Sequence, residues 1–217
     1  MKKILASLLI VVFLGISASA ADITMEQINT LNEFNIFQNA TSTDFADGSF
    51  MTRAQFTKAA YEIMKFKDGE VKAEAAPFPD VPLTHPESGY ISVMKEEGVI
   101  LGDENGKFNP DENITHYEAA KIIVTILGYQ PLALQRGGYP DGYFTVFTSL
   151  KLHKGWDSGG IVDQSISKNN LGITLANAMD TPFMERTFFI EGEDPQYKIM
   201  DGKNGTALFT PRIRFEK

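Results

Sequence analysis

Residues 24–181 repeat one order of elements three times: a short amphipathic helix, a glycine-containing loop and a second helix that begins at a Ser or Thr. The second copy is the clearest and runs from Gly89 to Tyr129, and its opening Gly-Tyr pair returns at Gly142. A unit of two helices cannot bury its own apolar face, so neighbouring copies must pack together. We therefore expect a mainly α, pseudo-threefold bundle in which the three second helices meet side by side.

The segments of the chain have these expected bounds: a signal peptide at 1–20, repeat one at 24–66, a linker at 67–77, repeat two at 78–129, repeat three at 139–181 and a tail at 182–217. In repeat one Thr52 is followed three residues later by Gln55, and in repeat two Thr115 is followed by Glu118. Both pairs predict a capping box, in which two side chains satisfy orphan N–H groups at a helix start. Ser167 predicts the third helix start, without a Glu or Gln at the third position.

Residues 1–20 have the composition of a secretory signal peptide. Lys2 and Lys3 precede an apolar run, and a segment of small residues ends at Ala20. The run is shorter than the ~20 residues that span a bilayer, and no later segment is apolar enough to cross a membrane. We expect export, cleavage after Ala20 and no membrane span in the mature protein.

The tail lacks the helical repeat, and its pattern is that of a short β-hairpin or of the start of a further region. Phe188-Phe189-Ile190 predicts one strand, Asp201-Gly202 a turn, and the segment from Ala207 to Thr210 a second strand.

The charge of the chain restricts its partners. The formal net charge is −8, and removal of Lys2 and Lys3 with the signal peptide takes it to −10. Nucleic acid and anionic lipid surfaces both need a basic footprint, so neither is an expected partner. An anionic polymer could bind only through a few local cations.

Catalytic and metal-binding patterns are weak. The segment from Asp103 to Lys107 resembles part of a calcium loop, but Lys107 replaces an oxygen ligand and Ile114 stands where a bidentate Glu belongs. The chain has no Cys, its three His lack zinc-site spacing, and no Ser lies in a Gly-x-Ser-x-Gly motif. We therefore expect no metal, no cofactor and no enzymatic activity.

Several motifs occur in a fixed order in repeat two: Phe78-Pro79-Asp80-Val81, Glu97-Gly98-Val99-Ile100-Leu101-Gly102, Gly106-Lys107-Phe108-Asn109-Pro110 and Ile114-Thr115-His116-Tyr117-Glu118-Ala119-Ala120. Repeat one carries Met51-Thr52-Arg53-Ala54-Gln55-Phe56 at its second helix start. In these motifs the chain resembles the S-layer homology (SLH) domain of bacterial cell-surface proteins. The resemblance is good in repeat two, fair in repeat one and degenerate in repeat three.

The resemblance implies a non-catalytic wall-binding module. Three tandem SLH units form a spindle whose grooves hold a pyruvylated secondary cell-wall polysaccharide, and the protein would lie in the wall or surface layer of a bacterium. Positions that match the groove-lining residues of the family are Arg53, Asp80, Gly102, Asp141 and Gly155. A guanidinium pairs bidentately with a carboxylate such as a pyruvyl ketal.

Repeats two and three depart from the arginine of the family pattern. His116 stands at that position in repeat two, and Lys168 stands there in repeat three as a weaker cationic candidate. Trp156 follows Gly155 and could stack on a sugar ring, although a partly buried structural anchor is the other interpretation. The alternative function is a structural or assembly role, in which the repeats contact other envelope proteins.

Overall fold

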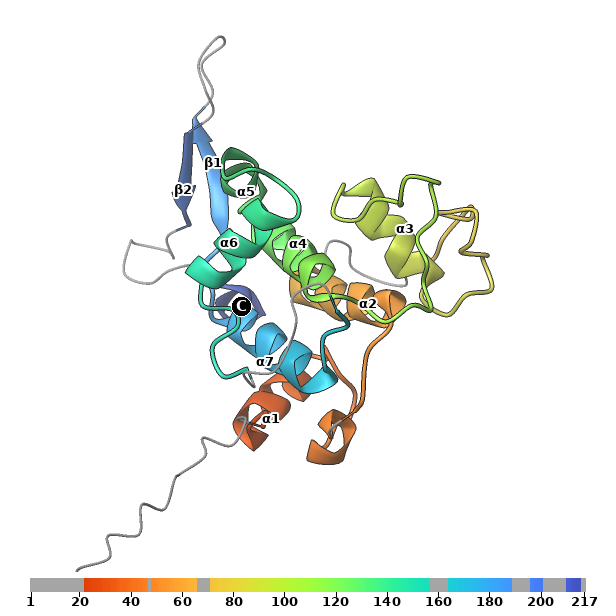
Figure 1. Ribbon diagram of the computed structural model, residues 1–217. Helices are drawn as coiled ribbons and strands as arrows, with labels where there is room; N and C mark the ends of the chain where they lie inside the picture. Colours follow the sequence, from red (N-terminus) through yellow and green to blue (C-terminus); the bar gives the residue numbers. More distant parts are fainter. Residues whose placement is uncertain are drawn as a thin grey trace, which may run out of the picture.

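The computed structural model describes residues 22–46, 48–65, 71–156, 164–188, 196–200 and 210–215. Within them the elements are α1 (Met25–Glu33), the 3₁₀ helix η1 (Ser42–Phe45), α2 (Arg53–Met64), α3 (Ser88–Glu96), α4 (His116–Ile126), α5 (Gln130–Gln135), α6 (Asp141–Ser149), α7 (Lys168–Met179), β1 (Met184–Phe188), β2 (Gln196–Ile199) and α8 (Pro211–Phe215) (Figure 1). The mainly α prediction is confirmed. The signal peptide and the Asp201-Gly202 turn lie outside the described residues.

The second helices of the repeats are α2, α4 and α7, and each begins where its cap predicts. Thr52 and Thr115 each accept a hydrogen bond from the backbone N–H three residues on, and the side chains of Gln55 and Glu118 each accept one from the cap N–H. Ser167 caps α7 with a single hydrogen bond, because no Glu or Gln answers it. Capping is a local property of sequence, and for this reason these starts are predictable.

The starts of these three helices are joined in a closed ring. The backbone N–H of the first residue of each helix donates to a carbonyl just before the start of the next. The bonds run from Arg53 to Glu112 (2.8 Å), from His116 to Gln164 (3.2 Å) and from Lys168 to Ser49 (2.9 Å). Met51, Ile114 and Ile166 precede the three caps and are all buried. The helix starts therefore have a pseudo-threefold arrangement around an apolar centre.

Each short helix packs against the second helix of a neighbouring repeat. Helix α3 contacts α2, α6 contacts α4, and α1 contacts α7. Figure 1 shows α2, α4 and α7 at the centre, with α1, α3 and α6 around them. Since every such pair joins two repeats, the surface grooves also form between repeats. Among the described residues, no helix is both long and apolar enough to cross a bilayer.

The tail contains an antiparallel hairpin, but its strands differ from the prediction. Strand β1 begins earlier than expected, with Met184 opposite Ile199 of β2. The predicted second strand at 207–210 is wrong at Thr210, which precedes helix α8; residues 207–209 lie outside the described residues. Pro211 explains the difference, because proline favours the first position of a helix and cannot donate to a strand ladder.

Candidate functional site

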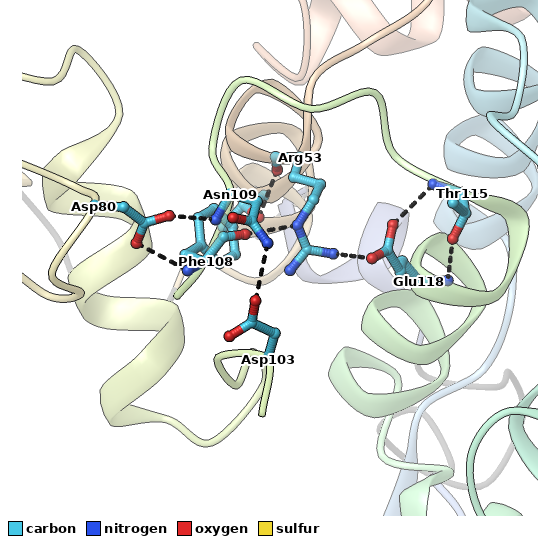
Figure 2. Close-up of polar contacts among 8 residues, drawn as sticks. Arg53, Asp80, Asp103, Phe108, Asn109, Thr115 and Glu118 are labelled. Carbon is cyan, nitrogen blue, oxygen red and sulfur yellow. Dashed lines mark hydrogen bonds and ion pairs between the residues drawn. The ribbon is translucent and has the colours of Figure 1, made fainter. Parts of the chain in front are cut away.

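Arg53 is the first residue of α2 and reaches across to repeat two. Its Nε donates to the carbonyl oxygen of Phe108 over 2.8 Å, and its guanidinium carbon lies 4.8 Å from the centre of the Phe108 ring. Its Nη1 forms an ion pair with Glu118 (Figure 2). Within the described part of the chain, Nη2 has no hydrogen-bond partner. The guanidinium is thus fixed in position and still has donors available.

Glu118 has two roles at the start of α4. One carboxylate oxygen accepts the N–H of Thr115 over 2.9 Å and completes the capping box, while the other pairs with Arg53. Figure 2 shows the carboxylate between these two groups. The sequence indicated only the capping role, because the ion pair depends on how two repeats pack.

Asp80 fixes the loop that holds Arg53 in position. Its two carboxylate oxygens accept the backbone N–H groups of Phe108 (2.9 Å) and Asn109 (2.7 Å). Partial burial opposes ionisation, but these two donors, with the backbone N–H of Asp80 itself and the charge of Lys107, outweigh it and hold the pKa of the Asp80 carboxyl below its usual value. Asp80 therefore fixes the loop whose Phe108 carbonyl holds Arg53, and it does not line the cavity described below.

The loop after α3 is closed by Asp103 and two glycines. The Asp103 carboxylate accepts the N–H of Lys107 and Asn105, and these bonds lower the pKa of Asp103. A Cβ on Gly102 would lie 2.9 Å from the carbonyl carbon of Gly106, so the close approach requires glycine. In the described residues, no group of three or more acidic, His or Cys side chains could hold a metal.

These parts surround a cavity of about 250 Å³, which we call groove 1. It is lined by Arg53, Val99, Ile100, Leu101, Gly102, Asp103, Asn109, Glu118, Lys121, Ile122 and Tyr139. Two of the sequence-predicted residues, Arg53 and Gly102, therefore meet in one groove. Sequence reasoning missed Lys121 and Tyr139. A signal for Lys121 was present, since Lys58 occupies the same position in repeat one.

A second cavity, of about 300 Å³, lies at the equivalent place between repeats three, one and two, and we call it groove 2. Its lining includes Lys168 at the arginine position, Gln55 at the position of Glu118, and Lys58 at that of Lys121. The ammonium of Lys58 lies 5.4 Å from the centre of the Tyr90 ring, the same distance that separates Lys121 from Tyr139 in groove 1.

The third equivalent position is filled by Trp156. Its indole N–H donates to the carbonyl of Asn170 and to the hydroxyl of Thr174, both at 3.0 Å. Its ring packs 5.3 Å from the rings of His116 and Phe147. This packing favours the structural-anchor interpretation of Trp156 over sugar stacking.

The remaining predicted residues of repeat three lie away from groove 1. Gly155 is exposed and has a φ of 101°, a backbone conformation that favours glycine. Asp141 is exposed at the start of α6 and, unlike Asp80, makes no side-chain hydrogen bond or ion pair among the described residues.

The chain is similar in sequence to known bacterial cell-surface proteins. Residues 77–120 match the family model of the S-layer homology domain. The "Cell surface protein" of Thermoanaerobacter kivui is 25% identical over 166 residues, which make up 76% of this chain and 20% of the relative. The "Surface layer protein" of Brevibacillus choshinensis is 26% identical over 187 residues, 85% of this chain and 16% of the relative. The "Middle cell wall protein" of Brevibacillus brevis is 23% identical over 185 residues, 84% and 17% respectively.

The chain thus spans a fifth or less of the length of these relatives. Their similarity extends well beyond residues 77–120 and covers most of the chain. Residues 77–120 are thus similar to an S-layer homology domain, and the match together with these relatives places the protein at the bacterial cell surface.

Proposed function

We propose that this protein is a non-catalytic wall-binding module that holds a pyruvylated secondary cell-wall polysaccharide in groove 1. The observation that carries the proposal is Arg53, whose guanidinium is fixed by Phe108 and Glu118 and keeps Nη2 available at the cavity. A preorganised guanidinium loses little side-chain entropy when it binds a carboxylate, and charge-assisted hydrogen bonds are stronger than neutral ones.

The charge distribution supports this assignment. The chain is strongly acidic overall, so an anionic polymer can approach only where cations are concentrated. Groove 1 provides two, Arg53 and Lys121. Groove 2 provides Lys58 and Lys168 without an arginine and is the weaker candidate. The third position has no open groove in this proposal, because Trp156 occupies it.

Two relatives are named for the surface layer and the cell wall. These names support a cell-surface location for both the protein and its proposed ligand. Export through the signal peptide at residues 1–20 belongs to the same proposal. The exported protein would meet the polymer in the wall.

The test is retention of the mature chain, residues 21–217, on purified cell-wall sacculi with and without their secondary polymer. We expect polymer-dependent retention that Arg53→Ala abolishes and Arg53→Lys reduces, since a lysine lacks the planar fork. Arg136→Ala is the matched control, because Arg136 is exposed, does not line groove 1, and within the described residues its side chain makes a single hydrogen bond, to Ser149 at the end of α6. Thermal unfolding of each variant separates lost binding from lost folding.

The second candidate is assembly through contacts with other envelope proteins. It is favoured by the single arginine among the three equivalent helix starts and by the filled third position. Equal retention on sacculi with and without polymer, or no retention, would contradict polysaccharide binding and favour this alternative.

A further inference from the structure

We propose that Lys95, Phe78 and Phe108 form an aromatic support that positions the guanidinium of Arg53, although none of the three lines groove 1. Phe78 and Lys95 are thus positioning residues, which act on Arg53 through the ring of Phe108. The expected effects on polymer binding rest on the proposed function of groove 1. The expected effects on Arg53 itself do not, because they are measured without a ligand.

The aromatic support is a series of contacts that begins at the surface of α3. The ammonium of Lys95, which is exposed, lies 4.4 Å from the centre of the Phe78 ring. The Phe78 ring stacks on that of Phe108, with centres 5.3 Å and planes 20° apart, and both rings are buried. The guanidinium carbon of Arg53 lies 4.8 Å from the centre of the Phe108 ring. Aromatic faces attract cations, and stacked rings hold each other in place, so the series connects Lys95 to groove 1.

The backbone of Phe108 is fixed by the same short motif that carries the Phe78 ring. Asp80 lies two residues after Phe78, and its carboxylate accepts the N–H of Asn109 over 2.7 Å. This N–H and the Phe108 carbonyl belong to one planar peptide unit, so the bond also orients the carbonyl. The carbonyl accepts the Nε–H of Arg53 over 2.8 Å (Figure 2). One motif therefore positions both groups of Phe108 that contact Arg53.

The contact between a ring and the arginine position recurs at the other two helix starts. The ammonium of Lys168 lies 5.6 Å from the centre of the Phe45 ring, and the ring centres of His116 and Trp156 are 5.3 Å apart. In each case the ring comes from the next repeat around the bundle. Phe45 meets Phe37 edge-to-face, at 88°, and not in a parallel stack. The ring contact thus belongs to the pseudo-threefold arrangement, and the stacked second ring is a feature of groove 1.

Lys95 forms the outer part of the aromatic support. Its ammonium donates to the carbonyl of Pro77, the residue before Phe78. The cation is therefore held over the Phe78 ring by a second contact. Because the side chain of Lys95 is exposed, its substitution alters the support without removing a buried ring.

The direct test is the NMR signal of the Arg53 Nε–H in the mature chain, assigned by its loss in Arg53→Lys. Phe78→Leu keeps a buried apolar side chain but removes the stacked ring. We expect it to shift this signal, because the Phe108 ring moves relative to the guanidinium. Exchange of the Nε–H with water should become about fivefold faster, since its bond to the Phe108 carbonyl opens more often. Phe45→Leu is the matched control, because Phe45 is 4% exposed and Phe78 5%, and it should leave both readouts unchanged.

Retention on polymer-bearing sacculi measures the consequence for binding. We expect Phe78→Leu to weaken retention about fivefold and Lys95→Met about twofold, on the scale of one aromatic pair and one exposed cation–π contact. Lys95→Arg keeps a cation over the ring and should restore both the Arg53 signal and retention. Lys95→Met also provides the test if Phe78→Leu does not fold, because it leaves the core intact.

The outcomes separate this inference from the proposed function. An Arg53 Nε–H signal and exchange rate that Phe78→Leu and Lys95→Met both leave unchanged would overturn the inference alone. Equal losses of retention in Phe78→Leu and Phe45→Leu, with the Arg53 signal unchanged, would also overturn it, because they would reflect folding. A shifted signal in Phe78→Leu, together with a wild-type chain that shows no polymer-dependent retention, would confirm the aromatic support and overturn the proposed function.

Discussion

Arg53 and Glu118 form an ion pair between the first turns of two helices from different repeats, α2 and α4. The pair positions the guanidinium at groove 1, but Glu118 also occupies one of its donors. A carboxylate ligand must therefore share Arg53 with a carboxylate of the protein. The balance between positioning and competition can be measured by altering Glu118 alone.

Glu118→Gln should strengthen polymer binding. Glutamine can keep the capping box, as Gln55 does at the start of α2, so the free energy of unfolding should fall by no more than about 1 kcal/mol. Removal of the competing charge should tighten binding by up to about fivefold, which corresponds to about 1 kcal/mol. Binding isotherms on polymer-bearing sacculi measure the effect, with Glu112→Gln, an exposed acid of the preceding loop, as the control. Weaker binding would mean that positioning outweighs competition.

Asp80→Asn should destabilise the loop that carries Phe108. The carboxylate accepts two backbone N–H groups, and an amide has one oxygen to offer, so one N–H loses its partner. The expected cost is about 1–2 kcal/mol in urea unfolding at pH 7. Asp141→Asn is a matched control at the corresponding position of repeat three, where the exposed carboxylate makes no such bond. Equal losses in the two variants would contradict the role given to Asp80.

The contribution of Asp80 should also depend on pH in a defined direction. Its pKa is lower in the folded protein than the ordinary value of about 3.9 for Asp. The unfolded chain then binds a proton more readily, so the stabilisation is complete above about pH 5 and is lost as the pH falls through the folded pKa. The difference in stability between wild type and Asp80→Asn should therefore shrink as the pH falls below the ordinary Asp value of about 3.9. A constant difference from pH 7 to pH 2.5 would be inconsistent with this linkage.

The starts of α2, α4 and α7 could be predicted because capping depends on residues three positions apart. The left-handed turn at Gly98 was predictable for the same local reason, and its φ is 70°. The resemblance to the S-layer homology domain also implied that Arg53 and Gly102 share a function. They now share a cavity, although no contact within either repeat would have brought them together.

The rest of the site depends on packing between repeats. Lys121 and Tyr139 lie in different repeats, and their proximity follows from the contact of α6 with α4. The position of Trp156 in the third groove could likewise not be predicted, because its hydrogen-bond partners Asn170 and Thr174 are known only from the structure. The tail was predicted less well, because short strands with few apolar residues give a weak periodic signal.

Trp156 should contribute to stability and not to binding. Trp156→Phe removes the N–H that satisfies Asn170 and the fully buried Thr174, at an expected cost of about 1–3 kcal/mol. Retention on polymer should be unchanged at a temperature where the variant is folded. Since Trp156 is the single tryptophan, its fluorescence provides a second check. Saturating polymer should leave the emission spectrum as it is, and quenching by the polymer would instead indicate a sugar at this position.

The last prediction concerns the arginine position in the other two repeats. Lys168→Arg places a guanidinium at groove 2, where the neutral Gln55 replaces Glu118 and does not compete for it. Retention should rise by about fivefold, or about 1 kcal/mol.

His116→Arg should have the opposite outcome, although it makes the sequence resemble the family more closely. His116 is only 4% exposed and packs against Trp156. A guanidinium there would be buried against an aromatic ring in a filled space, at a cost of at least about 2 kcal/mol. Retention on sacculi and thermal unfolding, measured in parallel for Lys168→Arg and His116→Arg, test both expectations. A gain in retention from His116→Arg, with folding intact, would mean that the third position can open and that Trp156 does not close it.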